Sequence, residues 1–188
     1  MSRIALRVIA LTGVIALLGV ASYAIAGGGT KNFKGKEMIG YNENPDVSTL
    51  ASGSFRARLS DDGTTLAYQL SYSGLEGNVQ QAHIHFAKPG VNGGISIWLC
   101  GTSPGFVPPT AGIPTCPQSG TVEGEVDMTD VIGPAGQGIA AGELAEIVAA
   151  MRAGHAYANV HSSKFPGGEI RAQLNNRSGD DDEGGDDD

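Results

Sequence analysis

Apolar and polar residues alternate through most of the central part of the chain. In residues 53–60, Phe55, Ala57 and Leu59 occupy every second position, and two arginines lie between them. Neighbouring side chains of a β-strand point to opposite faces, so this alternation predicts a strand with one apolar face.

The same alternation recurs along the sequence. Residues 65–72 repeat it, and the Ser-Asp-Asp-Gly sequence at 60–63 predicts a turn that joins the first two strands into a hairpin. Further alternating segments lie at 82–86, 95–99, 120–126, 155–162 and 168–174. The 29 glycines and nine prolines agree with many turns between short strands.

Short strands with one apolar face must bury that face against a second layer of sheet. The pattern therefore predicts an all-β protein, an antiparallel β-sandwich of short strands. The expected core residues are Leu66, Leu70, Ile84, Ile97, Val160, Ile170 and Leu174.

One segment, at about residues 142–153, has helical periodicity instead. Acidic Glu146 lies early in it, Arg152 lies late, and Gly154 can adopt the left-handed conformation that ends a helix. Its apolar residues recur at helical spacing: Leu144, Ile147, Val148 and Met151. We expect an amphipathic helix that caps one end of the sandwich.

The first 26 residues have the organisation of a secretory signal peptide. Two arginines precede an apolar stretch, and the segment ends in the small-residue sequence Ala24-Ile25-Ala26, which predicts cleavage before Gly27. The alternative is an uncleaved anchor, because residues 8–25 can be counted as the ~18 apolar residues that a short span requires. Cleavage would export the protein to the periplasm or the extracellular medium.

The remaining boundaries follow from composition. We expect a short linker at 27–32, one domain at 33–175 and an acidic, disordered tail at 176–188, since the tail has no apolar residue to bury. The tail can be a solvated segment, a weak calcium binder or an attractor for a basic partner. The net charge of −8 becomes −10 when the first 26 residues are removed, which argues against nucleic acid as a partner.

The two cysteines, Cys100 and Cys116, flank a proline- and glycine-rich loop. In an oxidising compartment they would most simply pair with each other, and closing ~15 residues corresponds to roughly 3 kcal/mol. Phe106, Val107 and Ile113 lie on this stiffened loop, where they can contact a partner or pack on the sandwich.

Taken together, four stretches of the sequence resemble the chordin-type (CHRD) domain family over roughly residues 33–174. They are NENP at 42–45, ASGSFRARLSDDGTTLAYQLSYSGLEG at 51–77, QAHIHFAKPGVNGGISIWLC at 81–100 and ELAEIVAAMRAGHAYANVHSSKFPGGEIRAQL at 143–174. The resemblance implies an extracellular all-β module, and no specific chemistry. It does not imply the ligand binding of chordin, whose cysteine-rich modules have no counterpart here.

Three of the four histidines are candidates for a site. Strand parity places His83 and His85 on one face, and it places His161 on the same face as Asn159. If the two strands are neighbours, the three imidazoles can converge and bind zinc or copper. The His-x-His strand also resembles the copper site of copper/zinc superoxide dismutases, although their acidic ligand and histidine-rich zinc loop have no match here.

Hydrogen bonding is the alternative role for these histidines. A buried imidazole needs partners for both ring nitrogens, and a structural network with Asn159, Glu169 and Arg171 can supply them. Such a network would fix the register of the strands.

No sequence motif of a hydrolase, metalloprotease or nucleotide-binding enzyme is present, which favours a protein without catalytic activity and without a required cofactor. We expect a secreted binding or structural module with an extracellular protein or surface as its partner, and no membrane contact after signal cleavage. The alternative function is a periplasmic or extracellular metal-binding protein, distantly similar to superoxide dismutase.

Overall fold

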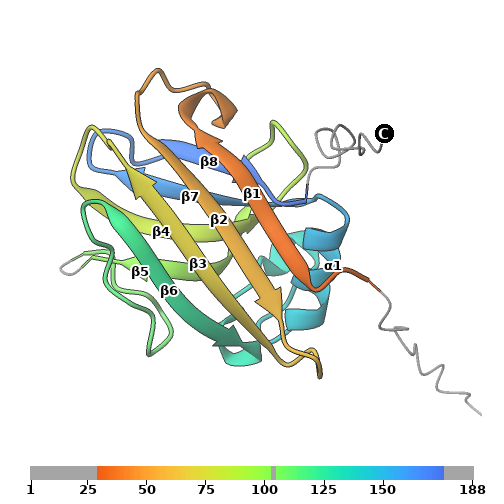
Figure 1. Ribbon diagram of the computed structural model, residues 1–188. Coiled ribbons are helices and arrows are strands. Elements are labelled where there is room, and N and C mark those ends of the chain that lie inside the picture. The colour runs from red at the N-terminus through yellow and green to blue at the C-terminus, as the bar shows by residue number, and fades with distance from the viewer. Residues whose placement is uncertain (1–28, 103–104, 176–188) are drawn as a thin grey trace, which may run out of the picture.

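A computed structural model describes residues 29–102 and 105–175, in which eight strands form one antiparallel sheet (Figure 1). The strands are β1 (Asn32–Ile39), β2 (Ser52–Leu59), β3 (Thr65–Ser73), β4 (Val79–Phe86), β5 (Gly94–Gly101), β6 (Gly120–Asp127), β7 (Ala156–Ser162) and β8 (Ile170–Gln173). Their order in the sheet is β5-β4-β7-β8-β1-β2-β3-β6. Three short 3-10 helices lie at Gly40–Asn42, Met128–Asp130 and Ala135–Gln137.

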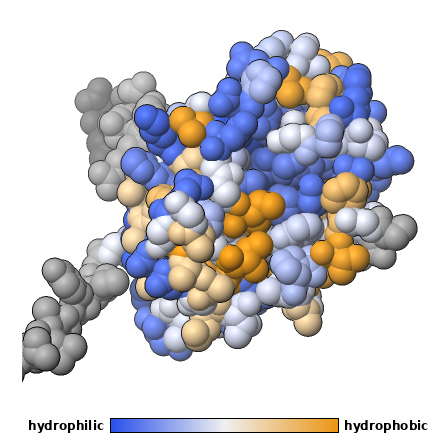
Figure 2. Space-filling model, turned by 180° about the vertical axis from the view of Figure 1, so that it is seen from behind, coloured by the Kyte–Doolittle hydropathy of each residue, from blue (hydrophilic) through white to orange (hydrophobic). Residues whose placement is uncertain are grey.

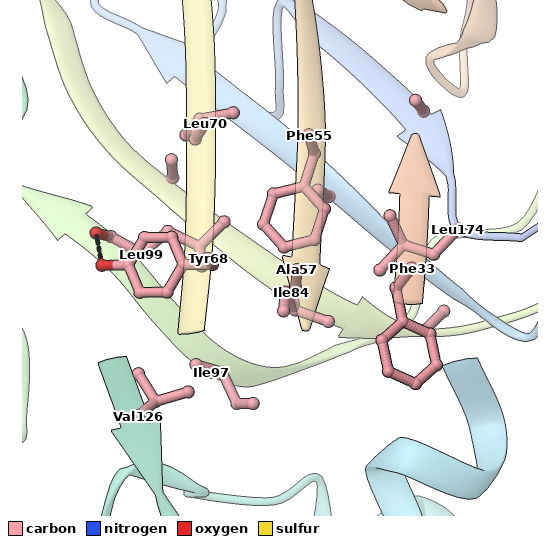
Figure 3. Close-up of a cluster of buried hydrophobic side chains, with 14 of the residues drawn as sticks. Phe33, Phe55, Ala57, Tyr68, Leu70, Ile84, Ile97, Leu99, Val126 and Leu174 are labelled. Carbon is pink, nitrogen blue, oxygen red and sulfur yellow. Dashed lines mark hydrogen bonds between the residues drawn. The ribbon is translucent and has the colours of Figure 1, made fainter. Parts of the chain in front are cut away.

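The sheet curls until its two halves face each other as the layers of a sandwich, so the predicted fold class is confirmed (Figure 1). Apolar side chains from both layers meet between them, and the Tyr68 hydroxyl donates a 2.7 Å hydrogen bond across the gap to the carbonyl oxygen of Leu99 (Figure 3). All seven expected core residues are fully buried. The predicted hairpin is also present, because β2 pairs with β3 in register from Ser52↔Ser73 to Leu59↔Leu66.

Strand β1 was not among the predicted strands. Its register against β2 shifts between Gly35 and Met38, so that the buried residues Phe33 and Met38 fall out of a simple alternation. A bulge of this kind inserts a residue and hides the period of two that identifies a strand.

The predicted helix is α1 (Leu144–Arg152), and it lies at one end of the sandwich (Figure 1). Its buried face consists of Leu144, Ile147, Val148, Ala150 and Met151. Gly154 follows with φ of 73°, as the sequence predicted for the helix stop. None of the described helices is long and apolar enough to cross a membrane.

Two of the predicted segments, the signal peptide at 1–26 and the tail at 176–188, lie outside the described residues. The expected linker at 27–32 overlaps the start of β1 by one residue, Asn32. Its last part is held to the domain, because Arg152 donates a 3.0 Å hydrogen bond to the carbonyl oxygen of Thr30.

A disulfide joins Cys100 to Cys116 and closes the loop between β5 and β6. The three apolar residues expected on this loop differ in exposure. Val107 is 65% exposed, whereas Phe106 is half-buried and Ile113 packs against the core. Of the two roles expected for these residues, packing on the sandwich therefore describes Ile113, which helps to anchor the loop, whereas Val107 remains available for contact with a partner.

Candidate metal centre

The candidate site lies on the outer side of the layer that contains β4 and β7. These strands pair antiparallel, with His83 opposite Asn159 and His85 opposite Tyr157. Because side chains alternate along a strand, Ile84 points into the core, whereas His83, His85 and His161 lie on the opposite face of the sheet. Although this face is the outer one, the three imidazoles are buried.

The structure brings the three histidines together. One potential ligand nitrogen from each of His83, His85 and His161 lies within 4.8 Å of the others. The Nδ1 atom of His83 and the Nε2 atom of His161 are 3.2 Å apart, and Asn159 Oδ1 is 3.0 Å from the same Nε2 atom.

Two of the imidazoles are oriented by backbone carbonyl groups. His161 Nδ1 donates a 3.0 Å hydrogen bond to the carbonyl oxygen of Pro166, and His85 Nδ1 donates a 2.9 Å bond to that of Gly93. A carbonyl oxygen can only accept, so in each neutral ring the proton resides on Nδ1 and Nε2 has a free lone pair.

A glycine is required beside His85. A Cβ atom at Gly93 would lie 1.9 Å from the carbonyl oxygen of Phe86, so only glycine lets the hairpin backbone approach β4 closely enough to orient His85. The Asn-Gly-Gly stretch at 92–94 was noted in the sequence only as a turn. Its second role is to position a histidine of the site.

Two nitrogen atoms of the cluster have no hydrogen-bond partner, although both are buried: His83 Nε2 and His85 Nε2. A buried polar atom without a partner costs about 1–3 kcal/mol, so hydrogen bonding within the protein does not account for the whole cluster.

Burial keeps the histidines neutral. It is the main cause that lowers the pKa of His83 to about 2, and the neighbouring imidazoles of His161 and His85 contribute to this shift in the same direction. Burial likewise lowers the pKa of His85 to about 4, although the bond to Gly93 opposes this effect. The pKa of His161 is also lowered, mainly by burial. All three lone pairs are therefore free of protons at neutral pH.

Aromatic rings form the walls of the site. The ring of Trp98 on β5 stands at 81° to that of His83, with centroids 4.4 Å apart. The ring of Tyr157 stacks on that of His85, with centroids 4.8 Å apart. The guanidinium of Arg171 lies over the Tyr157 ring, 4.3 Å from its centroid. These contacts restrict the rotation of two of the histidines and separate them from solvent.

Glu43 belongs to the same buried region and was missed in the sequence. Its side chain is 6% exposed, and burial raises its pKa to about 7 against the opposing attraction of Arg171 and hydrogen bonding that includes Asn159. Gly168, at φ of 128°, makes room for it, since a Cβ atom there would lie 2.5 Å from Glu43 Oε1. The Asn-Glu-Asn-Pro sequence was the available signal, but a glutamate in a loop is ordinarily exposed.

Two loops, one between β1 and β2 and one between β4 and β5, meet over this region. Asn44 Nδ2 donates to the carbonyl oxygen of Gly90, and Asn92 Nδ2 donates to that of Asn44. Arg171 donates to the carbonyl oxygen of Val91 and to Asn92 Oδ1, at 3.3 and 3.1 Å. These two loops cover the site, which explains why polar side chains on an outer face of the sheet are buried.

The structure places Glu169, one of the expected network residues, in a different cluster. Its carboxylate accepts hydrogen bonds from Thr49 Oγ1, from the backbone N–H of Glu76 and from Ser162 Oγ. Asn159 and Arg171 are the two expected network residues that do lie beside the histidines. The expected hydrogen bonding of Glu169 to the imidazoles is therefore wrong: Glu169 is close to His161 in sequence, but its carboxylate bonds to Thr49, Glu76 and Ser162 instead.

Three neutral imidazoles, each with one lone pair, are a donor set suited to copper or zinc. Among the described residues, no aspartate or glutamate joins the three histidines in this cluster. The site therefore lacks the carboxylate ligand that many catalytic zinc centres use.

The comparisons with known proteins agree with the architecture. A family model described as the CHRD domain matches residues 35–174, which is the bulk of the chain. No curated protein and no solved structure matches the sequence.

Proposed function

The chain belongs to the CHRD domain family, and from this premise we propose that it is an exported, non-catalytic module that binds a protein partner outside the cytoplasm. The single observation that carries the proposal is the disulfide-closed loop, which presents an apolar side chain to solvent on a rigid β-sandwich.

Two features support the compartment. CHRD domains occur in secreted proteins, and the bond between Cys100 and Cys116 indicates an oxidising environment. The arginine-containing, apolar start of the sequence supplies a route of export, with cleavage before Gly27. A mature chain of net charge −10 would be soluble and self-repelling. The face of the sandwich behind Figure 1 combines hydrophilic areas with an apolar patch near its centre (Figure 2).

Export and disulfide formation are tested together by the intact mass of protein recovered outside the cytoplasm. We expect a chain that begins at Gly27 and is lighter by two hydrogen atoms than the same chain after reduction. The control is the Cys100→Ser, Cys116→Ser double variant, whose mass does not change on reduction. A retained N-terminal segment, or two free thiols in the native protein, contradicts this part of the proposal.

The loop between β5 and β6 is held in place at its base. Gly101 N donates to the carbonyl oxygen of Pro114, Tyr72 donates from its hydroxyl to the carbonyl oxygen of Pro117, and Ile113 packs on the core. Val107 remains 65% exposed. A loop that is already ordered loses little conformational entropy on binding, which favours it as a contact surface.

Photo-crosslinking tests this contact. A photoreactive phenylalanine placed at Val107 is expected to give an adduct with an extracytoplasmic protein that is not obtained from the matched position Asp62, which is exposed on the β2–β3 turn. Adducts that are the same from both positions, or none from position 107, contradict partner binding through the loop.

The function similar to superoxide dismutase is not favoured. The family match is to the CHRD domain, and the histidine cluster in the described part of the chain includes no acidic ligand. Metal binding by the cluster is a separate matter and does not depend on that likeness.

A further inference from the structure

We propose that His83, His85 and His161 bind a single copper(I) ion beneath the loops that cover β4 and β7. The inference goes beyond the proposed function and stands on the geometry of the cluster alone. An exported binding module can contain such a site or lack it.

The first support is the direction of the lone pairs. The backbone carbonyls of Pro166 and Gly93 hold the Nδ1 protons of His161 and His85, so the Nε2 atoms of both rings are free to bind an ion. Metal-binding histidines commonly donate their second nitrogen to a backbone carbonyl or a carboxylate in this way, which fixes both the tautomer and the ring orientation. Two of the three candidate ligands here have that arrangement without an ion present.

The second support is the spacing. Ligands at ~2.0–2.1 Å from a metal lie about 3.3 Å apart at tetrahedral angles and about 4.1 Å apart on opposite sides. The 3.2 Å separation of His83 Nδ1 from His161 Nε2 is close to the tetrahedral value, and the 4.8 Å limit for the whole set exceeds the larger value by less than 1 Å. Small rotations of the side chains are enough to enclose an ion.

The third support is the set of unpartnered atoms. His85 Nε2 is buried, carries a lone pair and has no hydrogen-bond partner in the protein. His161 Nε2 faces Asn159 Oδ1 at 3.0 Å, so either the amide is turned to donate or a cation lies beside both atoms. One bound cation resolves both features at once.

The charge of the surroundings selects the ion. Three neutral imidazoles add no negative charge, and the positive charge of Arg171 acts on His85. No carboxylate is among the three candidate ligands, and burial of Glu43 in the same region favours its neutral form. The cost of moving an ion out of water rises with the square of its charge, so a monovalent ion is favoured over a divalent one. Copper(I) is monovalent and binds imidazole, whereas zinc is divalent and would need a water molecule or a further ligand in its fourth position here.

The test uses the purified protein with its disulfide intact. Copper(I) is supplied with ascorbate in the absence of oxygen, because ascorbate leaves the disulfide intact, and affinity is measured by competition with the chromophoric chelator bicinchoninate. We expect one copper(I) per chain, weaker binding of zinc, and a melting temperature that rises with free copper(I). X-ray absorption of the loaded native protein is expected to show three nitrogen neighbours of the imidazole type.

Variants locate the site. His85→Ala and His161→Ala are expected to lower the copper(I) affinity by at least ~100-fold, more than the loss of an outer hydrogen-bond partner. The matched control is His155→Ala, which removes the fourth and exposed histidine and is expected to retain full binding. Ions held by acidic side chains elsewhere in the chain would survive all three substitutions.

Three results overturn the proposal. They are the absence of one-to-one binding by the native protein, tighter binding of zinc than of copper(I), and unchanged affinity in His85→Ala. If the histidine variants do not fold, the X-ray absorption of the native protein decides, because a spectrum without three imidazole nitrogens is incompatible with this site. None of these results bears on export or on the disulfide loop, so the two proposals fail separately.

Discussion

Acidification from pH 7 to pH 4 is expected to lower the free energy of unfolding of the metal-free domain. The cause is the buried histidine cluster, in which His83 has a pKa of about 2 and His85 a pKa of about 4, against 6.5 when the chain is unfolded. Burial is the main cause of both shifts, and it acts in the same direction on His161.

The sign follows from where protons bind. Between pH 6.5 and pH 4 the unfolded chain binds protons at these histidines and the folded chain does not, so stability falls as the pH falls. One pKa unit corresponds to about 1.4 kcal/mol, so His83 and His85 each contribute about 3 kcal/mol across this window. A typical domain has a total stability of about 5–15 kcal/mol, so the loss is large.

Glu43 opposes this effect in part of the same window. Its pKa is raised to about 7 by burial, so the folded chain binds a proton there that the unfolded chain, at 4.5, does not. Acidification from pH 7 to pH 4.5 therefore stabilises the protein by up to about 3 kcal/mol through Glu43. The Glu43→Gln variant removes this compensation and should lose stability more steeply on acidification than the native protein.

Urea unfolding at a series of pH values, followed by the fluorescence of the single tryptophan, Trp98, measures these effects. His155 is exposed, so the pH profile of His155→Ala should follow that of the native protein. A free energy of unfolding that stays constant or rises down to pH 4 would falsify the account.

Most of the fold was predictable because alternation reports directly on burial. Six of the seven core positions lie on strands, where each second side chain faces the other layer, and Leu174 directly follows β8. Strand β1 was not predictable in this way, because the shift between Gly35 and Met38 breaks the period. Helix α1 was found because four apolar residues follow the helical period and a glycine ends it.

The site was predictable only as far as strand parity extends. The alternation of side chains along a strand placed His83 with His85 and Asn159 with His161. The pairing of β4 with β7 is a tertiary contact, which the local sequence of neither strand predicts. Glu43, Trp98 and the carbonyl oxygen of Pro166 approach from other segments, so their part in the site could be found only in three dimensions. Sequence alone likewise could not reveal that loops bury this outer face.

Arg171→Ala is expected to be the most damaging single substitution near the site, with a loss of about 3–5 kcal/mol in the free energy of unfolding. The guanidinium is 2% exposed, donates to Val91 O and Asn92 Oδ1, and lies over the Tyr157 ring. Its removal leaves these acceptors buried without a donor and opens a cavity. Arg56→Ala, on an exposed strand face, should change stability by no more than about 0.5 kcal/mol.

A double-mutant cycle with Glu43→Gln separates charge from packing. Attraction by Arg171 lowers the pKa of Glu43 against the larger effect of burial, so without Arg171 an ionised Glu43 is left more costly to bury. Above pH 7, Arg171→Ala should therefore cost less in the Glu43→Gln background, by about 0.5–3 kcal/mol. Urea unfolding at pH 8 measures the four proteins of the cycle. Equal losses in the two backgrounds would show that Arg171 stabilises the covering loops through its hydrogen bonds and packing, with no contribution from the charge of Glu43.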